Sequence, residues 1–566
     1  MRGAVAAWLA CAMAVSSSRL AAQATDTTNV LPRDVAKEVV ALFNATTALR
    51  ATDRLNIDSG RTVTGDVAVL NGPVTIAGHV TGRVLAINAD VILRRGAHID
   101  GDLLVVGGEV EGRDVGRVDG EIRVYHPPLR YTQDGDQLVA QLDADAGEQW
   151  WRRWERRGRR NFNRLEIASA GPYNRVEGLP IRVGPVLYRD QGWGHLRLDA
   201  TAIVRTSSSF AGSEADVGHD LAGEIRIGRQ FGATLGGRLF DRVDGVEQWQ
   251  LNDVEVALAS FLFHRDYRDY FGRHGGTIRA ALRATEDADL TLSYSDERWS
   301  SRGEHDPFTL FQNDLAWRVN PRVDDGRFHL ANLTLRVDTR NDAFTPWAGW
   351  YVLADYERGT GKIDVAAPTS PGVRTSTAGP TRYIRGFLDL RKYNRLAPNS
   401  ALNLRLVLGG WLSGDPLPVE RRLSIDGPGT IPGFDFRTGG GTDVGTCSLG
   451  TTIPGTPAQC ERISLVQLEY RNDIRLSFSD GEVPFRRNRF RADGAWVFFA
   501  DAGRGWLVNG PGSPLNFGRT DFPPLSTYRT DIGVGLDFDQ FGIYTAKALS
   551  EPAEPLNVFV RVRHRF

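Results

Sequence analysis

The sequence predicts an all-β fold, in which an antiparallel transmembrane β-barrel of about 16 strands follows a small β-solenoid-like domain. Two patterns support this prediction: apolar and polar residues alternate from about residue 169 to the end, and a glycine-spaced repeat precedes them. A third observation concerns charge, because the 566 residues carry a formal net charge of only -1. A chain so close to neutrality has no overall attraction for nucleic acid or for acidic substrates.

Residues 169–566 are predicted to form the barrel. In the last strand one face is apolar and the other is basic, with Val558, Val560 and Val562 opposite Arg561, Arg563 and Arg565. A water-soluble sandwich or barrel would pack its apolar face inward, whereas a membrane barrel turns that face to lipid and keeps charges in a wet lumen. Roughly 400 residues of one pattern exceed what a single small soluble core needs, so we favour the membrane barrel.

Residues 59–125 are predicted to form the solenoid-like domain. Triplets of Gly, a polar or charged residue and an aliphatic residue recur at 65–67, 82–84, 101–103 and 120–122, with spacings of 17, 19 and 19 residues. A unit this short cannot bury its own apolar face, but stacked units form a continuous core. The repeat resembles bactofilin-like, polymer-forming β-helix domains. That resemblance implies self-association, or binding of a periplasmic partner, through this domain.

The segment 1–24 has the three features of a secretory signal peptide. Arg2 supplies the positive charge, residues 4–15 are apolar, and Ala22-Gln23-Ala24 matches the small-x-small cleavage pattern. A buried N-terminal helix is the alternative. Export would place the N-terminal domain in the periplasm.

Two further segments flank the solenoid-like domain. Within 25–58, apolar residues at helical spacing over 32–50 predict a short amphipathic helix that packs on the next domain. Segment 126–168 is a connector rich in Trp and Arg, whose indole rings are predicted to lie at headgroup depth in a membrane interface. These tryptophans are Trp150, Trp151 and Trp154. A solvated linker is the alternative, and the export signal argues against nucleic-acid binding.

The two cysteines outside the signal segment lie close together in a Gly/Thr/Pro-rich stretch. Cys447 and Cys460 are predicted to form one local disulfide, as suits an exported protein with few cysteines. A zinc site is the rival, but no His lies near either cysteine and two thiols alone do not complete such a site.

Several segments of the barrel region, in order, resemble the bacterial surface antigen barrel of the BamA/TamA-type assembly-factor superfamily. Asp338-Thr339-Arg340 followed by Gly349-Trp350 is similar to a turn of that family. The stretch 427–437 is similar to its loop that folds back into the lumen, and 496–506 to a lumen-facing acidic strand. The resemblance implies that an inward loop and a lumen carboxylate form the functional motif, which here comprises Gly427, Pro432, Gly433, Phe434, Asp435, Arg437, Asp501 and Gly503.

Two positions of that motif carry specific expectations. Pro432 stands where the family has an arginine, so the carboxylate of Asp501 needs another partner, and we expect Arg437 to supply it, because an unpaired buried charge is costly. The terminal Phe566 resembles the insertion signal of outer-membrane barrels and is expected to end the closing strand.

The resemblance implies a protein of the outer membrane of a Gram-negative-type bacterium that inserts or exports proteins or lipids. Its expected partners are outer-membrane lipids and unfolded outer-membrane or secreted proteins. The repeated POTRA modules of such factors are not recognisable in the sequence, which leaves two alternatives open: a passive solute channel and a periplasmic anchoring or scaffold protein. Removing residues 427–440 should impair membrane integrity under the first hypothesis.

No catalytic motif stands out, so we expect no enzyme, no cofactor and no metal. His264, Asp266 and Asp269 are interpreted as a loop or lumen charge cluster, since the other motifs of a kinase are missing. A Ser/His/acid set assembled only in space, as in barrel phospholipases, would not be visible in the sequence.

Overall fold

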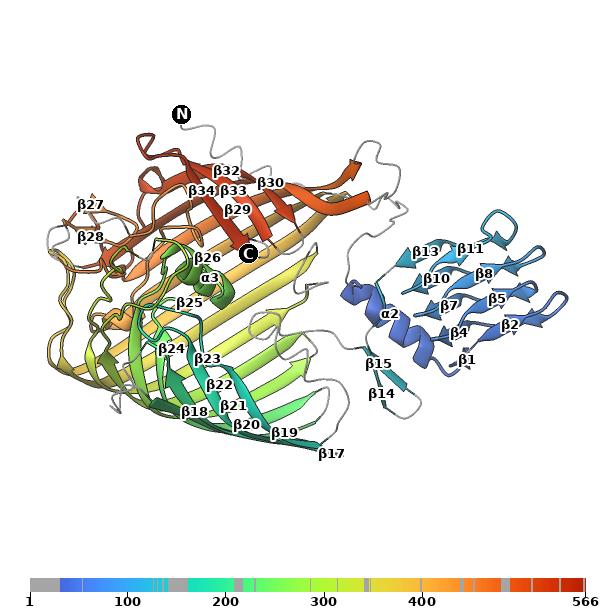
Figure 1. Cartoon of the computed structure of the whole chain (residues 1–566), viewed down its shortest axis with the longest axis horizontal. Coiled ribbons are helices and arrows are strands. Elements are labelled where there is room, and N and C mark those ends of the chain that lie inside the picture. Colours follow the sequence, from blue (N-terminus) through green and yellow to red (C-terminus); the bar gives the residue numbers. More distant parts are fainter. Residues whose placement is uncertain are drawn as a thin grey trace. The chain divides into compact units, whose positions relative to one another are not determined.

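The computed structural model describes residues 31–566 except 53, 126, 130, 135–136, 141–160, 208–216, 229–230, 286, 313, 341–345, 347, 398–399, 438–441, 451–452, 480–488, 510–512, 539–540 and 563–564 (Figure 1). The predicted signal segment 1–24 and the connector tryptophans Trp150, Trp151 and Trp154 therefore lie outside the described residues. The chain divides into two compact units, Met1–Asp143 and Ala144–Phe566, which are described separately.

The first unit is a three-sided solenoid of parallel strands. One sheet has the order β1-β4-β7-β10-β13, the second β11-β8-β5-β2 and the third β12-β9-β6-β3. The strands are β1 (Leu49–Ala51), β2 (Leu55–Ile57), β3 (Thr62–Val63), β4 (Val67–Leu70), β5 (Val74–Ile76), β6 (His79–Val80), β7 (Val84–Ile87), β8 (Val91–Leu93), β9 (His98–Ile99), β10 (Leu103–Val106), β11 (Val110–Glu111), β12 (Arg117–Val118) and β13 (Ile122–Tyr125). The solenoid thus begins at Leu49, ten residues before the predicted boundary.

The repeated glycines stack on one another at one corner of the solenoid. A Cβ atom on Gly82 would lie 2.4 Å from the backbone of Gly65, one on Gly101 would lie 2.8 Å from that of Gly82, and one on Gly120 would lie 2.5 Å from that of Gly101. Real Cβ atoms do not approach other atoms so closely, so only glycine fits each corner. This column is the physical origin of the sequence repeat.

The solenoid buries apolar residues both inside its coils and under a helix. Its interior contains side chains of every coil, such as Val69, Ala86 and Val105. Helix α2 (Arg33–Asn44) and the hairpin β14 (Tyr131–Asp134) and β15 (Gln137–Ala140) cover the outer face of the β1-β4-β7-β10-β13 sheet. The predicted amphipathic helix is therefore present and packs on the next domain, although it ends at Asn44 because the chain enters β1.

The second unit is an antiparallel sheet that curls into a barrel. Its strands are β16 (Asn161–Ser169), β17 (Pro180–Gln191), β18 (Gly194–Arg205), β19 (Val217–Ile227), β20 (Gly232–Gly245), β21 (Tyr270–Thr285), β22 (Ala288–Ser301), β23 (Asp325–Asp338), β24 (Gly349–Val365), β25 (Gly379–Ala397), β26 (Ser400–Gly414), β29 (Arg462–Ser479), β30 (Arg489–Val508), β32 (Arg529–Phe538), β33 (Phe541–Ala548) and β34 (Asn557–Val562). Each pairs with the next in sequence order, and the short β31 (Asn516–Phe517) only adds a parallel pairing to β30. The prediction of 16 antiparallel strands is confirmed.

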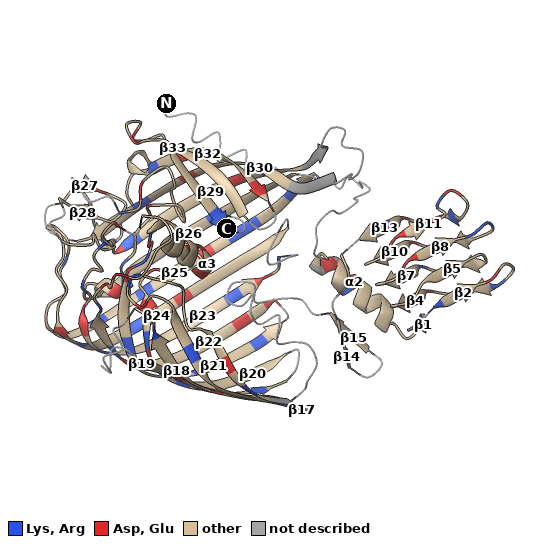
Figure 2. Ribbon diagram, viewed as in Figure 1, with Lys and Arg blue, Asp and Glu red and all other residues tan. Residues whose placement is uncertain are grey.

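The outer face of this sheet is apolar and the inner face is charged. Leu404 and Leu333 are 40% and 43% exposed, whereas Asn403 and Arg405, the neighbours of Leu404 on β26, are buried. Strands seen from inside the barrel carry basic and acidic residues along their length (Figure 2). A soluble barrel would have the opposite arrangement, so the structure has the inside-out pattern of a transmembrane barrel.

The connections between strands differ at the two ends of the barrel. At one end they are short, as in the two-residue turn at 192–193, and at the other they are long, as at 246–269, 302–324 and 415–461. The first of these long connections contains helix α3 (Asp253–Phe263). Outer-membrane barrels show the same asymmetry between short turns and long loops.

None of the helices in the described part of the chain has both the length and the apolar character needed to cross a membrane.

Candidate functional site at the barrel seam

The first and last strands of the barrel do not pair with each other. Among the described residues, every other neighbouring pair of barrel strands forms a ladder, but no ladder joins β16 to β34. Both strands therefore present an edge with unpaired backbone groups. A bare edge cannot persist in lipid, because no water is present to satisfy its N–H and C=O groups.

Helix α3 satisfies the edge of β34 with side chains. The backbone N–H of Val562 donates to Oε1 of Glu255 (2.9 Å), and the carbonyl oxygen of Val562 accepts from Nδ2 of Asn252 (3.2 Å). The same two residues form the capping box at the start of α3, in which each side chain accepts from the backbone N–H of the other. One acceptor and one donor are thus held in place beside the strand, as a neighbouring strand would hold them.

Arg561 connects β34 to two different loops. Its Nε donates to Oε1 of Glu255 (2.6 Å), and its Nη1 donates to the carbonyl oxygen of Pro428 (3.1 Å) in the long connection 415–461. The guanidinium is buried, so both contacts are shielded from water. Helix α3, the last strand and the inward loop therefore meet at one side chain.

The second half of the connection 246–269, which contains α3, lies against the β16–β17 connection near the start of the barrel. The rings of Phe261 in α3 and Tyr173 in the β16–β17 connection meet edge to face at 5.4 Å. The fully buried Arg175 pairs with Asp266 at 3.0 Å and with Asp269 at 3.1 Å. The connection 246–269 therefore contacts both β34 and the β16–β17 connection. The interpretation of Asp266 and Asp269 as a charge cluster is confirmed, whereas His264 stacks on the ring of Trp317 instead.

The face of α3 that does not contact β34 is apolar. Leu258, Phe261 and Phe263 are each about two-fifths to one-half exposed. An exposed apolar face on a helix of a lipid-facing barrel is compatible with contact to acyl chains. The helix is thus apolar beyond its polar first turn, and that first turn lies on the strand edge.

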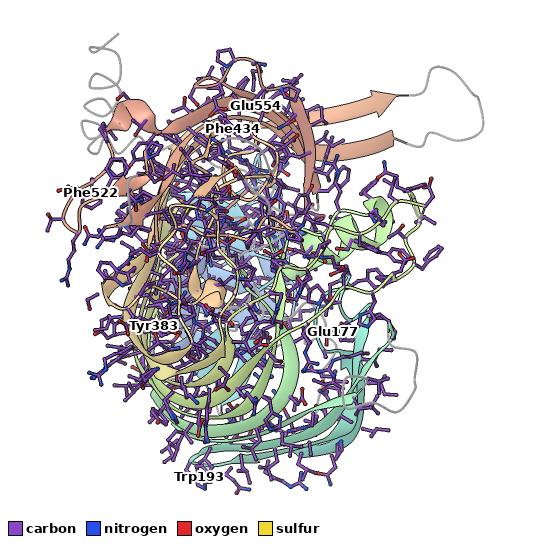
Figure 3. All side chains as sticks on the ribbon, turned by 90° about the vertical axis from the view of Figure 1, so that its left-hand side faces the viewer. Glu177, Trp193, Tyr383, Phe434, Phe522 and Glu554 are labelled. Carbon is purple, nitrogen blue, oxygen red and sulfur yellow. A yellow bond between two sulfur atoms is a disulfide. The ribbon has the colours of Figure 1, made fainter. Side chains whose placement is uncertain are left out.

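The connection 415–461 folds into the barrel, as the sequence predicts. Residues 422–427 and 429–434 are all buried, and Phe434 lies inside the ring of strands (Figure 3). The backbone N–H of Gly433 donates to Oδ2 of Asp531 on β32 (2.5 Å), and the carbonyl of Pro432 accepts from Nδ2 of Asn557 on β34 (3.1 Å). The tip of the inward loop therefore lies on β32 and on β34, the last strand at the seam.

Glycine is required at two positions of this loop by close contacts. A Cβ on Gly433 would lie 2.6 Å from Cβ of Asp531, and one on Gly427, where φ is +91°, would contact the ring of Phe436. Gly503 on β30 lies beside Ile431 of the loop. Asp435, by contrast, is exposed and is not drawn into this cluster.

The predicted pair of Arg437 and Asp501 is wrong. Arg437 is buried and binds Glu247 (2.6 Å) and Asp269 in the connection 246–269. Asp501 pairs instead with Arg565. Burial raises the pKa of Glu247, although Arg437 and Ser424 oppose the shift, and burial lowers the pKa of Arg437.

The C-terminal tail supplies the cation that pairs with Asp501, since Pro432 cannot. Strand β34 ends at Val562, and Arg565 is buried where its guanidinium reaches Asp501 and lies over the ring of Phe499. The ring centroid of Phe566 lies 6.4 Å from that of the buried Tyr393 on β25. The expectation that the closing strand ends at Phe566 is therefore wrong, because the tail turns into the lumen. Its role as an insertion signal stays a prediction.

The predicted disulfide between Cys447 and Cys460 is present. It lies within the connection 415–461, and Leu423 forms an isolated bridge with Cys460. A Cβ on Gly505 of β30 would lie 2.2 Å from Sγ of Cys460, so the disulfide packs directly on the barrel wall. It anchors the base of the inward loop.

Comparison with known proteins gives only distant likenesses. No protein-family model and no curated protein matches the chain. Similar solved structures include BamA from Haemophilus ducreyi lacking POTRA domains 1–3, with 15% identity, TM-score 0.42, and coverage of 71% of this chain and 70% of that one. CdiB from Escherichia coli has 12% identity, TM-score 0.31 and coverages of 77% and 67%. CdiB from Acinetobacter baumannii has 12% identity, TM-score 0.30 and coverages of 75% and 60%.

The strand ladders and the outward apolar face define the class of protein without these likenesses: a 16-stranded transmembrane barrel with an inward loop and an unpaired seam. The residues that cover the seam were not predicted. Asn252-x-x-Glu255 is recognisable in the sequence as a capping box. Nothing in its spacing shows that the box also contacts a strand some 300 residues further along the chain.

Proposed function

We propose that this chain is an outer-membrane factor that admits polypeptide strands at the seam between β16 and β34, and so assists protein insertion or translocation. The observation that carries the proposal is the state of Val562, whose backbone groups are held by two side chains instead of a strand. An extended segment can replace such contacts by adding to the edge, which is how β-augmentation works.

The inward loop supports the same proposal. Its carbonyl groups at Pro428 and Pro432 accept hydrogen bonds from Arg561 and Asn557, both on β34. Movement of the last strand would therefore displace the inward loop in the lumen. Coupling of this kind is expected where opening of the wall must be linked to the contents of the barrel. A plain pore has no need for it.

The test uses a defined strand as the client. A fluorescent peptide copying residues 557–566 is titrated with the full chain in detergent micelles, and binding is followed by fluorescence polarisation. Glu255→Ala removes the acceptor for Val562, so we expect binding to tighten about 10-fold, which corresponds to about 1.4 kcal/mol. The double variant Asn252→Cys, Val562→Cys, oxidised to tie α3 to β34, should bind weakly.

Asp253→Ala is the matched control. Asp253 lies in the same first turn of α3 as Glu255, but it pairs with Arg268 (2.6 Å) rather than with β34. This variant removes an acidic residue from the helix start without exposing the strand edge, and should bind as the unaltered chain does. Equal binding by all variants would contradict the proposal.

The passive channel makes a different prediction. Steady conductance of the unaltered chain in planar bilayers would favour a channel, because the proposed factor keeps its lumen occupied by the inward loop. Conductance that appears only after removal of residues 427–440 would support the loop as a plug.

A further inference from the structure

The outer face of the solenoid carries two histidines and two aspartates in adjacent columns. His79 and His98 are register partners on β6 and β9, and their rings stack with centroids 4.7 Å apart. Asp100 and Asp119 lie two residues after His98 and Arg117, which are partners on β9 and β12. The four side chains thus belong to three successive coils and share one face.

The polar atoms of this group converge. Oδ1 of Asp100 lies 2.7 Å from Nε2 of His79 and 3.4 Å from Nε2 of His98. Nε2 of His98 is also 2.8 Å from Oδ2 of Asp119. One ligand atom from each of His79, His98 and Asp100 can be chosen so that all lie within 4.8 Å of one another.

We propose that these residues form a binding site for a divalent transition metal ion of the zinc class, with His79, His98 and Asp100 as ligands and Asp119 completing the set. Nothing in the barrel proposal depends on this site. Imidazole nitrogen and carboxylate oxygen together suit Zn²⁺ and its first-row neighbours, whereas Ca²⁺ and Mg²⁺ prefer oxygen alone.

Two features favour a metal over simple hydrogen bonds. One carboxylate for each ring, Asp100 for His79 and Asp119 for His98, already satisfies the hydrogen bonds, yet Oδ1 of Asp100 also lies 3.4 Å from Nε2 of His98 and so faces both rings. In addition, the ladder spacing of a solenoid fixes the two rings at adjacent coils, so the ligands are held before the ion arrives. The side chains are 34–40% exposed, which leaves the ion a path from solvent.

The carboxylate of Asp119 accepts a hydrogen bond from Nε of Arg117 (2.7 Å) and lies 2.8 Å from Nε2 of His98. Two carboxylates and two neutral imidazoles would together balance the double positive charge of the bound ion. Arg117 (2.7 Å from Asp119) offsets part of the charge of the two carboxylates.

The test is a competition for Zn²⁺ between the untagged full chain in detergent and a chromophoric chelator. We expect one ion per chain, and Co²⁺ in its place should give visible d–d absorption of a low-symmetry site. Changes to groups that only support a ligand weaken metal binding 10–100-fold, so His98→Asn and Asp100→Asn should weaken it by about 100-fold or more. Circular dichroism of each variant verifies that the fold is retained.

His195→Asn is the matched control, because His195 lies beside Glu224 (3.6 Å) on the barrel and outside the proposed ligand set. Its Zn²⁺ affinity should equal that of the unaltered chain. The proposal is overturned if no Zn²⁺ is bound at about 100 µM free ion, where any site with a tighter Kd would be mostly filled. Equal affinity of His98→Asn, Asp100→Asn and the unaltered chain would overturn it as well.

Discussion

The closed wall of the barrel and its seam satisfy the same backbone requirement in different ways. Between β29 and β30 the ladder continues from the pair Arg462–Trp506 to the pair Ser479–Arg489, so each strand holds the other along its length. At the seam, two side chains of one helix hold one residue of β34. A ladder resists opening as a unit, whereas a few side-chain contacts can be exchanged one at a time. The seam is therefore the part of the barrel wall that separates most easily.

The largest effect should come from unpairing the lumen carboxylate next to the seam. Arg565→Gln leaves Asp501 buried without its cation, and loss of one partner of a buried ion pair costs about 3–5 kcal/mol. Urea unfolding of the barrel in detergent, followed by gel mobility, measures the loss. Arg565→Gln with Asp501→Asn removes both charges and should recover much of the stability. A loss below about 1 kcal/mol in the single variant would show that the tail is not needed to neutralise the lumen.

The next effect concerns how the inward loop is anchored to the closed wall. Replacing Cys447 and Cys460 by serine frees a loop closed by residues 13 apart in sequence, and the chain-entropy model gives a loss of about 3 kcal/mol. The same unfolding measurement applies, with reduction of the unaltered chain as the independent check. If neither treatment lowers stability, contacts of the loop with the strands already hold it.

The smallest effect should come from the seam itself. Glu255→Ala removes the acceptor of both Val562 and Arg561, and hydrogen bonds to a charged group contribute about 1.5–3 kcal/mol. We expect a value near the lower limit rather than the full cost of a broken buried ion pair, because Arg561 keeps its hydrogen bond to the carbonyl of Pro428 and lies on the edge strand of the sheet, which can shift to readmit water. Hydrogen exchange should show faster exchange in β34 while β29 and β30 are unchanged. Uniform acceleration in all three strands would mean that the seam is no weaker than the wall.

The sequence was sufficient for features that repeat and insufficient for contacts that do not. Period-two alternation predicts the barrel strands because lipid and lumen impose it residue by residue, as Leu404 and Arg405 illustrate. The glycine spacing predicts the solenoid because each corner excludes a Cβ atom. Both patterns recur at regular intervals along the chain, so the sequence alone reveals them.

The partners of Asp501 and Arg437 could not be predicted by the same means. A buried carboxylate requires a cation, and this requirement was correctly inferred, but the candidates were equivalent in charge and differed only in position. Arg565 pairs with Asp501 from a buried position beyond the end of β34 at Val562, and no spacing in the sequence distinguishes it from Arg437 as the partner. Likewise, Glu255 contacts β34 only because the long connection 246–269 folds back against the last strand.

The glycine column of the solenoid constrains how such a domain can change its size. Each coil must return a glycine to this corner, which has no space for a Cβ atom, so an insertion is tolerated only where the rest of the coil absorbs it, as the intervals of 17 and 19 residues between Gly65, Gly82 and Gly101 show. Each added turn would extend the domain by one strand spacing, about 4.8 Å. The length of such a domain therefore changes in steps of one coil, and duplication of a coil lengthens it without redesign of its interior.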